Sequence, residues 1–87
     1  MWDVRLSARA EKDKELLKRA GLEEKARQLL KVLASNPFQN PPPYEKLIGD
    51  MNGSYSRRIN ISHRLVYEVD KENQIVYILM MWSHYGD

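Results

Sequence analysis

The first third of the chain has the hydrophobic pattern of a strand followed by two helices. Residues 2–6 alternate hydrophobic and polar side chains, which is the period of a half-buried strand. Ser7 is a good cap for a helix over about residues 8–20, and Gly21 supplies the left-handed conformation that commonly ends a helix. The hydrophobic face of this helix is thin, and its main members are Leu16, Leu17 and Ala20.

A second helix is better specified, because hydrophobic residues recur every three or four positions along one stripe. The stripe consists of Leu22, Ala26, Leu29, Leu30 and Leu33. The helix is expected to end near residues 35–36, since the residue before Pro37 avoids the helical conformation. Four prolines in residues 37–43 then leave too few N–H donors for regular structure. We interpret this stretch as an ordered crossing loop.

Beyond the loop the pattern changes to the period-two alternation of strands. Residues 55–61 and 64–69 alternate in this way, and polar turns are expected at residues 60–63 and 71–74. Residues 75–82 are almost entirely hydrophobic, which indicates a strand buried on both faces. The predicted fold class is α+β, with a two-helix hairpin on a four-stranded sheet that joins the N-terminal strand to an antiparallel three-stranded meander.

Length and composition predict a single domain over residues 1–87, because neither half is large enough to fold alone. The chain has no cysteine, which excludes disulfides, thiolate zinc sites and a cysteine nucleophile. It has no run of about 18 hydrophobic residues and no secretory signal profile at its start. We therefore expect a cytoplasmic protein that does not use a membrane as a partner.

The charge is small overall but unevenly distributed. Residues 41–64 hold Lys46 and three arginines against two carboxylates, whereas residues 65–87 hold one lysine against four carboxylates. A protein with so few clustered cations should bind free RNA weakly and with strong salt dependence.

A basic pair near a histidine and a carboxylate suits the cleavage of RNA through its own 2'-hydroxyl. This reaction needs a base for the hydroxyl proton, an acid for the leaving 5'-oxygen, and cations for the phosphorane. Carboxylate or imidazole can be the base, imidazolium the acid, and arginine the phosphate clamp, without a metal ion. The candidate cations are Arg58 and Arg64, and His84 follows the hydrophobic strand, which gives it a rigid support.

Each of these residues taken alone also has an ordinary structural interpretation. A solvated strand face accounts for Arg57 and Arg58, and a hydrogen-bonded strand end accounts for His84. Glu45 fits a surface carboxylate, and His63 fits a solvated turn residue.

Four short segments favour the catalytic interpretation, because together they resemble one known family. They are Pro-Tyr-Glu-Lys-Leu at 43–47, Gly-Ser-Tyr-Ser-Arg-Arg-Ile at 53–59, His-Arg-Leu-Val-Tyr at 63–67 and His-Tyr at 84–85. The resemblance covers about residues 36–85 and is to the YoeB/Txe branch of the RelE/ParE toxin-antitoxin superfamily.

This resemblance implies a RelE-like fold and a toxin that cleaves messenger RNA in the decoding site of the ribosome, without metal or other cofactor. The implied partners are the ribosome, messenger RNA and a YefM/Phd-type antitoxin that silences the toxin, with a homodimer as a further candidate assembly.

The resemblance also assigns roles to individual residues. It implies Glu45 as general base, His84 as general acid and Arg64 as the stabiliser of the phosphorane. Arg58 would neutralise a nearby phosphate, and Tyr85 would orient the substrate or support the histidine.

One position departs from the family pattern. Relatives carry a lysine three positions after the glutamate, where this chain has Ile48, so Lys46 is the nearest cation for substrate binding.

The alternative is a non-enzymatic relative: a ParE-like protein that acts by binding gyrase, or an inactive toxin that only binds its antitoxin. ParE-like relatives usually lack the glutamate, arginine and histidine set, so the residues present here favour the endoribonuclease.

Overall fold

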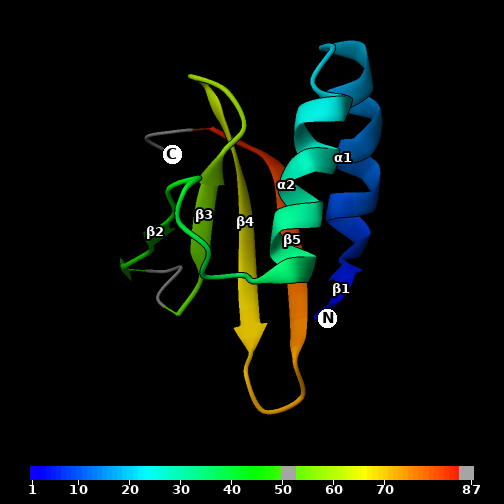
Figure 1. The fold of residues 1–87 in the computed structure, drawn as a ribbon. Coiled ribbons are helices and arrows are strands. Elements are labelled where there is room, and N and C mark those ends of the chain that lie inside the picture. Colours follow the sequence, from blue (N-terminus) through cyan, green and yellow to red (C-terminus); the bar gives the residue numbers. More distant parts are fainter. Residues whose placement is uncertain (50–52, 85–87) are drawn as a thin grey trace.

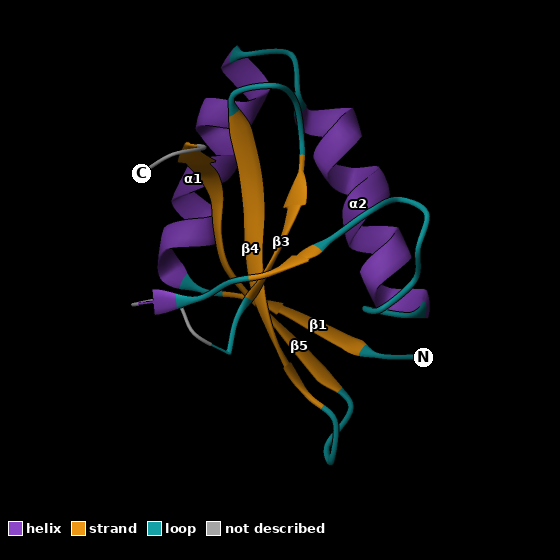
Figure 2. Ribbon diagram, turned by 90° about the vertical axis from the view of Figure 1, so that its left-hand side faces the viewer, coloured by secondary structure: helices purple, strands orange, loops and turns teal. Residues whose placement is uncertain are grey.

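The computed structural model describes residues 1–49 and 53–84, and over this part of the chain two helices pack on one side of a five-stranded sheet (Figure 1). The strand order is β1-β5-β4-β3-β2, with β1 parallel to β5 and the other neighbours antiparallel. Seen from the β2 side, both helices lie behind the sheet (Figure 2). The elements are β1 Asp3–Leu6, α1 Ala8–Arg19, α2 Glu23–Ser35, β2 Glu45–Lys46, β3 Tyr55–Arg58, β4 His63–Asp70 and β5 Ile75–His84.

The predicted α+β class is confirmed, but the sheet has one strand more than expected in the described residues. The additional strand is β2, in which Glu45 pairs with Ser56 and Lys46 with Tyr55. The strand expected over residues 55–61 ends at Arg58, which leaves Ile61 in the following turn with 84% of its surface exposed.

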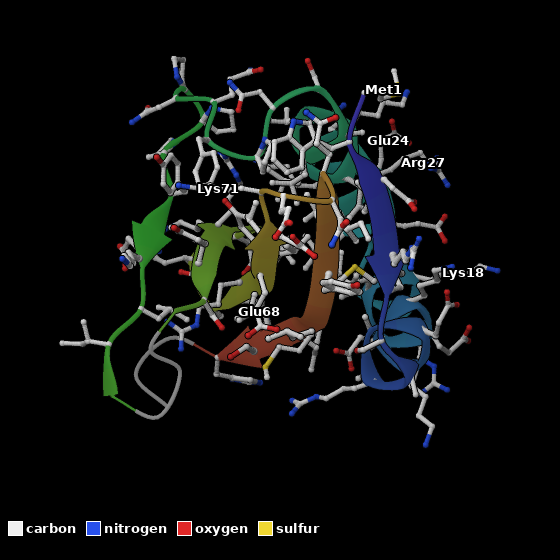
Figure 3. All side chains as sticks on the ribbon, turned by 90° about the horizontal axis from the view of Figure 1, so that it is seen from below. Met1, Lys18, Glu24, Arg27, Glu68 and Lys71 are labelled. Atoms are coloured by element: carbon white, nitrogen blue, oxygen red, sulfur yellow. The ribbon has the colours of Figure 1, made fainter. Side chains whose placement is uncertain are left out.

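The predicted boundaries of α1 are confirmed by its caps. Ser7 Oγ accepts a hydrogen bond from the Ala10 N–H at 3.0 Å, and Gly21 after the helix has a φ of 73°. Charged side chains of the helices, such as those of Lys18 and Arg27, point away from the sheet (Figure 3). Among the described residues, neither helix has the length and hydrophobicity needed to span a membrane.

The face that α1 turns to the sheet differs from the prediction. Leu17 is buried as expected, but Leu16 and Ala20 are exposed, and the other buried positions are Ala10 and Asp13. The sequence pattern missed these because one is a small residue and the other a carboxylate. The core between helices and sheet is formed by Ala10, Leu17, Ala26, Leu29, Leu33, Ile59, Leu65, Tyr67, Val76, Ile78 and Met81.

Strand β5 is irregular in its second half. Its register against β4 shifts twice, so that β5 carries extra residues relative to its partner, as at β-bulges. The strand was expected to be buried on both faces; this is wrong for its first half, where Tyr77 is 38% exposed. The pairs that define the shifts are Tyr67 with Ile78, Val66 with Met80, and Arg64 with Ser83.

Side chains from the start of the molecule bind the backbone of this irregular segment. Ser7 Oγ donates to the carbonyl of Leu79 at 2.7 Å, and the N–H of Met81 donates to Asp13 Oδ2 at 2.9 Å. Asp13 is only 5% exposed, so its carboxylate lies inside the protein with a backbone donor. The start of the chain thus fixes the part of β5 that leads to His84.

The proline-rich loop is held by Arg57, which is 1% exposed. Its guanidinium donates to the carbonyls of Pro37 at 3.0 Å and Gln39 at 2.8 Å, and also to that of Pro42. It lies 5.0 Å from the ring centroid of Tyr44. The solvated strand face expected for Arg57 is therefore wrong, because a loop poor in N–H groups leaves carbonyls that a guanidinium can satisfy.

Candidate functional site

A pocket lies where β4 begins and β5 ends. These antiparallel strands bring Arg64 beside the end of β5, and β1 stops at Leu6, so the first turn of α1 contributes Arg9. The cavity measures about 260 Å³. Its lining residues are Arg9, Arg64, Val66, Met80, Trp82, Ser83 and His84.

The two predicted cations Arg58 and Arg64 lie opposite each other in the β3–β4 register, but their contacts differ. Arg64 is half-buried, and its Nε lies 3.5 Å from Oγ of Ser83, its partner on β5. Arg58 is exposed, and its Nη1 donates to the carbonyl of Ile61 at 3.4 Å in the β3–β4 turn. Arg58 lines a second pocket, between that turn, α2 and the proline-rich loop. Arg64 is thus the predicted cation that lies in the pocket with His84.

His84 is exposed at the end of β5, and its imidazole contacts that of His63, its partner on β4. The ring centroids are 4.4 Å apart and the rings cross at 72°. The His63 ring also stacks on the ring of Trp82, with the ring centroids 3.8 Å apart and an angle of 23° between the ring planes. Burial and, secondarily, the nearby His84 lower the pKa of His63 below its usual value.

The position expected for His63 in a solvated turn is wrong. It is the first residue of β4, it is half-buried, and both ring nitrogens are closed to solvent without a hydrogen-bond partner in the part of the chain that the structure describes. The sequence pattern could not show this, because the covering ring comes from Trp82, nineteen positions away in the chain.

Glu45 and Lys46 lie on the edge strand β2, three strands across the sheet from β5, and both are exposed. Glu45 belongs to a row of paired residues that continues through Ser56 and Val66 to Met80. Three strand spacings of about 4.8 Å separate the ends of this row by roughly 14 Å. Glu45 therefore does not line the pocket that holds Arg64 and His84.

Neighbouring residues of a strand point to opposite faces, so Lys46 projects away from the face of Glu45. Ile48, at the family's lysine position, is 86% exposed. Tyr85 lies outside the described residues.

Sequence reasoning missed two residues of the pocket. Ser83 pairs with Arg64, and its position next to His84 is the one signal that could have drawn attention to it. Arg9 gives no such signal, because its placement depends on the parallel pairing of β1 with β5.

The chain is similar to known proteins in family, sequence and structure. A family model described as the YoeB-like toxin of bacterial type II toxin-antitoxin systems matches residues 7–85. The chain is 39% identical over 64 residues to a toxin YoeB from Synechocystis sp.. The aligned stretch covers 74% of this chain and 67% of that protein.

Solved structures give the same result. The YoeB/ParE toxin from Agrobacterium tumefaciens superposes with a TM-score of 0.83 at 32% identity, covering 95% of this chain and 99% of that chain. A chain of the heterotetrameric YoeB-YefM complex from Staphylococcus aureus superposes with a TM-score of 0.78 at 32% identity, covering 98% of this chain and 99% of that chain. Since the family match extends over most of the sequence and the fold agrees with that of its members, the protein belongs to the YoeB-like toxins of bacterial type II toxin-antitoxin systems.

Proposed function

We propose that this toxin is an endoribonuclease that cleaves messenger RNA on the ribosome, in the cytoplasm, and so inhibits translation. The observation that carries the proposal is the pocket in which Arg64 and His84 lie together, with Arg9 as a further cation. A guanidinium and an imidazole are the groups that a phosphodiester needs for charge stabilisation and proton donation.

In the proposed reaction the 2'-oxygen forms a bond to phosphorus and the bond from phosphorus to the 5'-oxygen breaks. A base takes the 2'-hydroxyl proton, and the His84 imidazolium gives its proton to the leaving 5'-oxygen. Arg64 stabilises the negative charge that develops on the phosphorane oxygens. The hydroxyl of Ser83, 3.5 Å from Arg64 Nε, helps to hold the guanidinium in place. The products are a 2',3'-cyclic phosphate and a free 5'-hydroxyl.

Glu45 is the proposed base, and its place on β2 sets a condition on the substrate. The RNA must lie across β3 and β4, so that one phosphodiester is reached by Glu45 from β2 and by His84 from β5. The roughly 14 Å between the backbones of β2 and β5 would be spanned by the side chains of Glu45 and His84, two hydrogen bonds of about 2.6–3.2 Å and the phosphodiester between them. Arg58 and Tyr85 would contact flanking parts of the RNA, and Lys46 would contact only RNA that passes around the edge strand β2 to its other face.

The ribosome would supply the orientation that a small, open pocket with few cations lacks. Fixing the message in one geometry removes much of the entropic barrier to reaction. We therefore expect the purified protein to cleave free RNA poorly and translated RNA efficiently.

The decisive experiment maps cuts in a translated message by primer extension, with and without ribosomes. The His84→Ala and Arg64→Ala variants should lose cleavage while keeping the circular dichroism spectrum of the wild type. Glu45→Gln should lower the rate by about 10²–10⁴-fold, the usual contribution of a general base. Arg19→Ala on α1, outside the pocket, is the matched control and should cleave normally.

Undiminished cleavage by both the His84 and the Arg64 variants would remove these residues from the mechanism. Normal cleavage by Glu45→Gln alone would reassign the base to another group. Inhibition of DNA supercoiling with intact RNA would replace the endoribonuclease by a ParE-like binding function.

We further propose that an antitoxin of the YefM type binds and silences this protein, as the Staphylococcus aureus relative is found in a complex with YefM. An extended acidic antitoxin segment would bind over the exposed hydrophobic side chain of Leu16 and the cations of residues 41–64. Co-expression with a YefM-type antitoxin should yield a stable complex and relieve growth arrest.

A further inference from the structure

His63 lies between two aromatic side chains that come from the strand carrying the candidate acid. Its ring stacks on Trp82 with centroids 3.8 Å apart, and the ring of His84 meets it edgewise at 4.4 Å. His63 and His84 are also direct partners in the β4–β5 ladder, so the backbone fixes their Cα atoms relative to each other. Strand pairing and ring contact thus both connect His63 to the end of β5.

We propose that His63 is a positioning residue: its ring, fixed on Trp82, holds the His84 imidazole at the pocket and takes no proton in the reaction. This inference rests on the proposed function, in which His84 is the acid.

The two nitrogens of His63 are badly placed for proton transfer. Both are closed to solvent and have no hydrogen-bond partner among residues 1–49 and 53–84. A catalytic acid or base must come within hydrogen-bond distance of the atom it serves, directly or through one water. A substrate outside the pocket wall cannot meet that condition at His63.

The same surroundings disfavour a proton on His63. Burial favours the neutral form of His63, and a second positive charge on a ring 4.4 Å away would be repelled. The other charged groups at the pocket are Arg9 from α1 and Arg64 from β4, and both are cations. The exposed ring of His84 is the one that water or a phosphate can approach.

The orientation of the His84 ring depends on its contact with the His63 ring. It is exposed and ends β5, so the ring of His63 is its one aromatic contact among the described residues. Misplacing a catalytic group by about 1 Å can cost on the order of 10²-fold in rate. Removing the His63 ring should therefore lower kcat more than it changes KM.

The test compares three variants on programmed ribosomes and, in the isolated protein, by NMR of the imidazole C–H signals. His63→Phe keeps a ring without nitrogens, His63→Leu fills similar volume without a ring, and Ser62→Ala in the exposed turn is the control. We expect the Phe and Ser62 variants to keep kcat within about threefold of the wild type. The Leu variant should lose about 10–100-fold in kcat with KM nearly unchanged.

In the NMR experiment, the His84 signal should keep its chemical shift in the Phe variant. In the Leu variant it should move toward the values of an unstructured histidine. Normal kcat for a folded Leu variant, or a folded Phe variant as slow as Leu, would overturn the proposal.

Failure of the proposed function is distinguishable from failure of this inference. A wild-type protein that does not cleave RNA contradicts the endoribonuclease, whereas the NMR comparison still decides the positioning role. His84 signals that are the same in the wild type and in the Phe and Leu variants would exclude it.

Discussion

Asp13 illustrates how a single charged residue can serve the core. Its carboxylate is 5% exposed within a helix and accepts the N–H of Met81 at 2.9 Å, next to the shift in register of β5. Arg9 Nε lies 3.9 Å from the same carboxylate oxygen. A backbone N–H released by a β-bulge needs a partner, and the first helix supplies it.

Replacing this carboxylate should therefore destabilise the protein. We expect Asp13→Ala to lower the free energy of unfolding by about 1–3 kcal/mol, the cost of leaving a buried donor without its partner. Glu15→Ala, at an exposed position of the same helix, is the control and should change it by less than about 0.5 kcal/mol. Urea denaturation measures both, and equal losses would contradict this role for Asp13.

In strand β5, the alternation of positions along the sequence does not predict which side chains are buried throughout the strand. Val76 and Ile78 are buried at even positions, but beyond the first register shift burial passes to Met81 and Ser83 at odd positions. The change occurs at the register shifts, where Ser7 and Asp13 from the first part of the chain bind the backbone of β5, and no local pattern contains these contacts.

The two helices, the Ser7 cap and Gly21 stop of α1, and the long hairpin of β4 and β5 were predictable because their signals are local. The period of Leu29 and Leu33, the Ser7 cap and the polar turn at 71–74 each act within a few residues. The two-residue strand β2 gave no such signal, since it exists through pairing with β3. For the candidate site, the sequence predicted a set of residues, but not that the fold places some of them in the pocket and others on the edge strand β2.

Arg57 holds the proline-rich loop in place, and the loop leads into β2. The loop leads directly into Glu45, so the three carbonyls bound by Arg57 determine where the edge strand begins. The hydroxyl of Tyr67 adds a hydrogen bond to the carbonyl of Pro37 at 2.9 Å.

Arg57→Met should loosen this element. It removes every donor of the guanidinium while keeping an apolar chain, and we expect a loss of about 3 kcal/mol in the free energy of unfolding. The amide of Leu47, which donates to the carbonyl of Ser54 at 2.8 Å, should exchange its hydrogen faster because β2 pairs less well. Arg58→Met is the matched control, with an expected loss below about 1 kcal/mol. Hydrogen exchange that is unchanged in Arg57→Met would contradict the dependence of β2 on the loop.

The stability of the whole molecule depends on pH through the buried ring of His63. Its pKa is lower in the folded protein than the ordinary value of 6.5, so the unfolded chain binds a proton that the folded protein resists. Stability from this group is complete above about pH 6.5 and is lost as the pH falls through that value toward the lower pKa of the folded state.

Urea unfolding at several pH values between 7.5 and 4.5 should show a free energy that declines on acidification. The decline should be shallower in His63→Phe, which has no group to protonate there. Asp70 is the internal comparison: hydrogen bonds from Asn73 lower its pKa below 3.8, so its contribution disappears only in more acidic solution. Identical slopes for wild type and His63→Phe would show that His63 is not the group responsible.

The outermost strands of the sheet have a consequence for the protein in a concentrated solution. β2 presents Glu45 and Lys46, and β1 presents Asp3 and Arg5, joined by an ion pair of 2.9 Å; all four are exposed. Short, charged edge strands discourage the addition of a further strand from another molecule. The same edge that carries the proposed base thus also protects the sheet against fibrous aggregation.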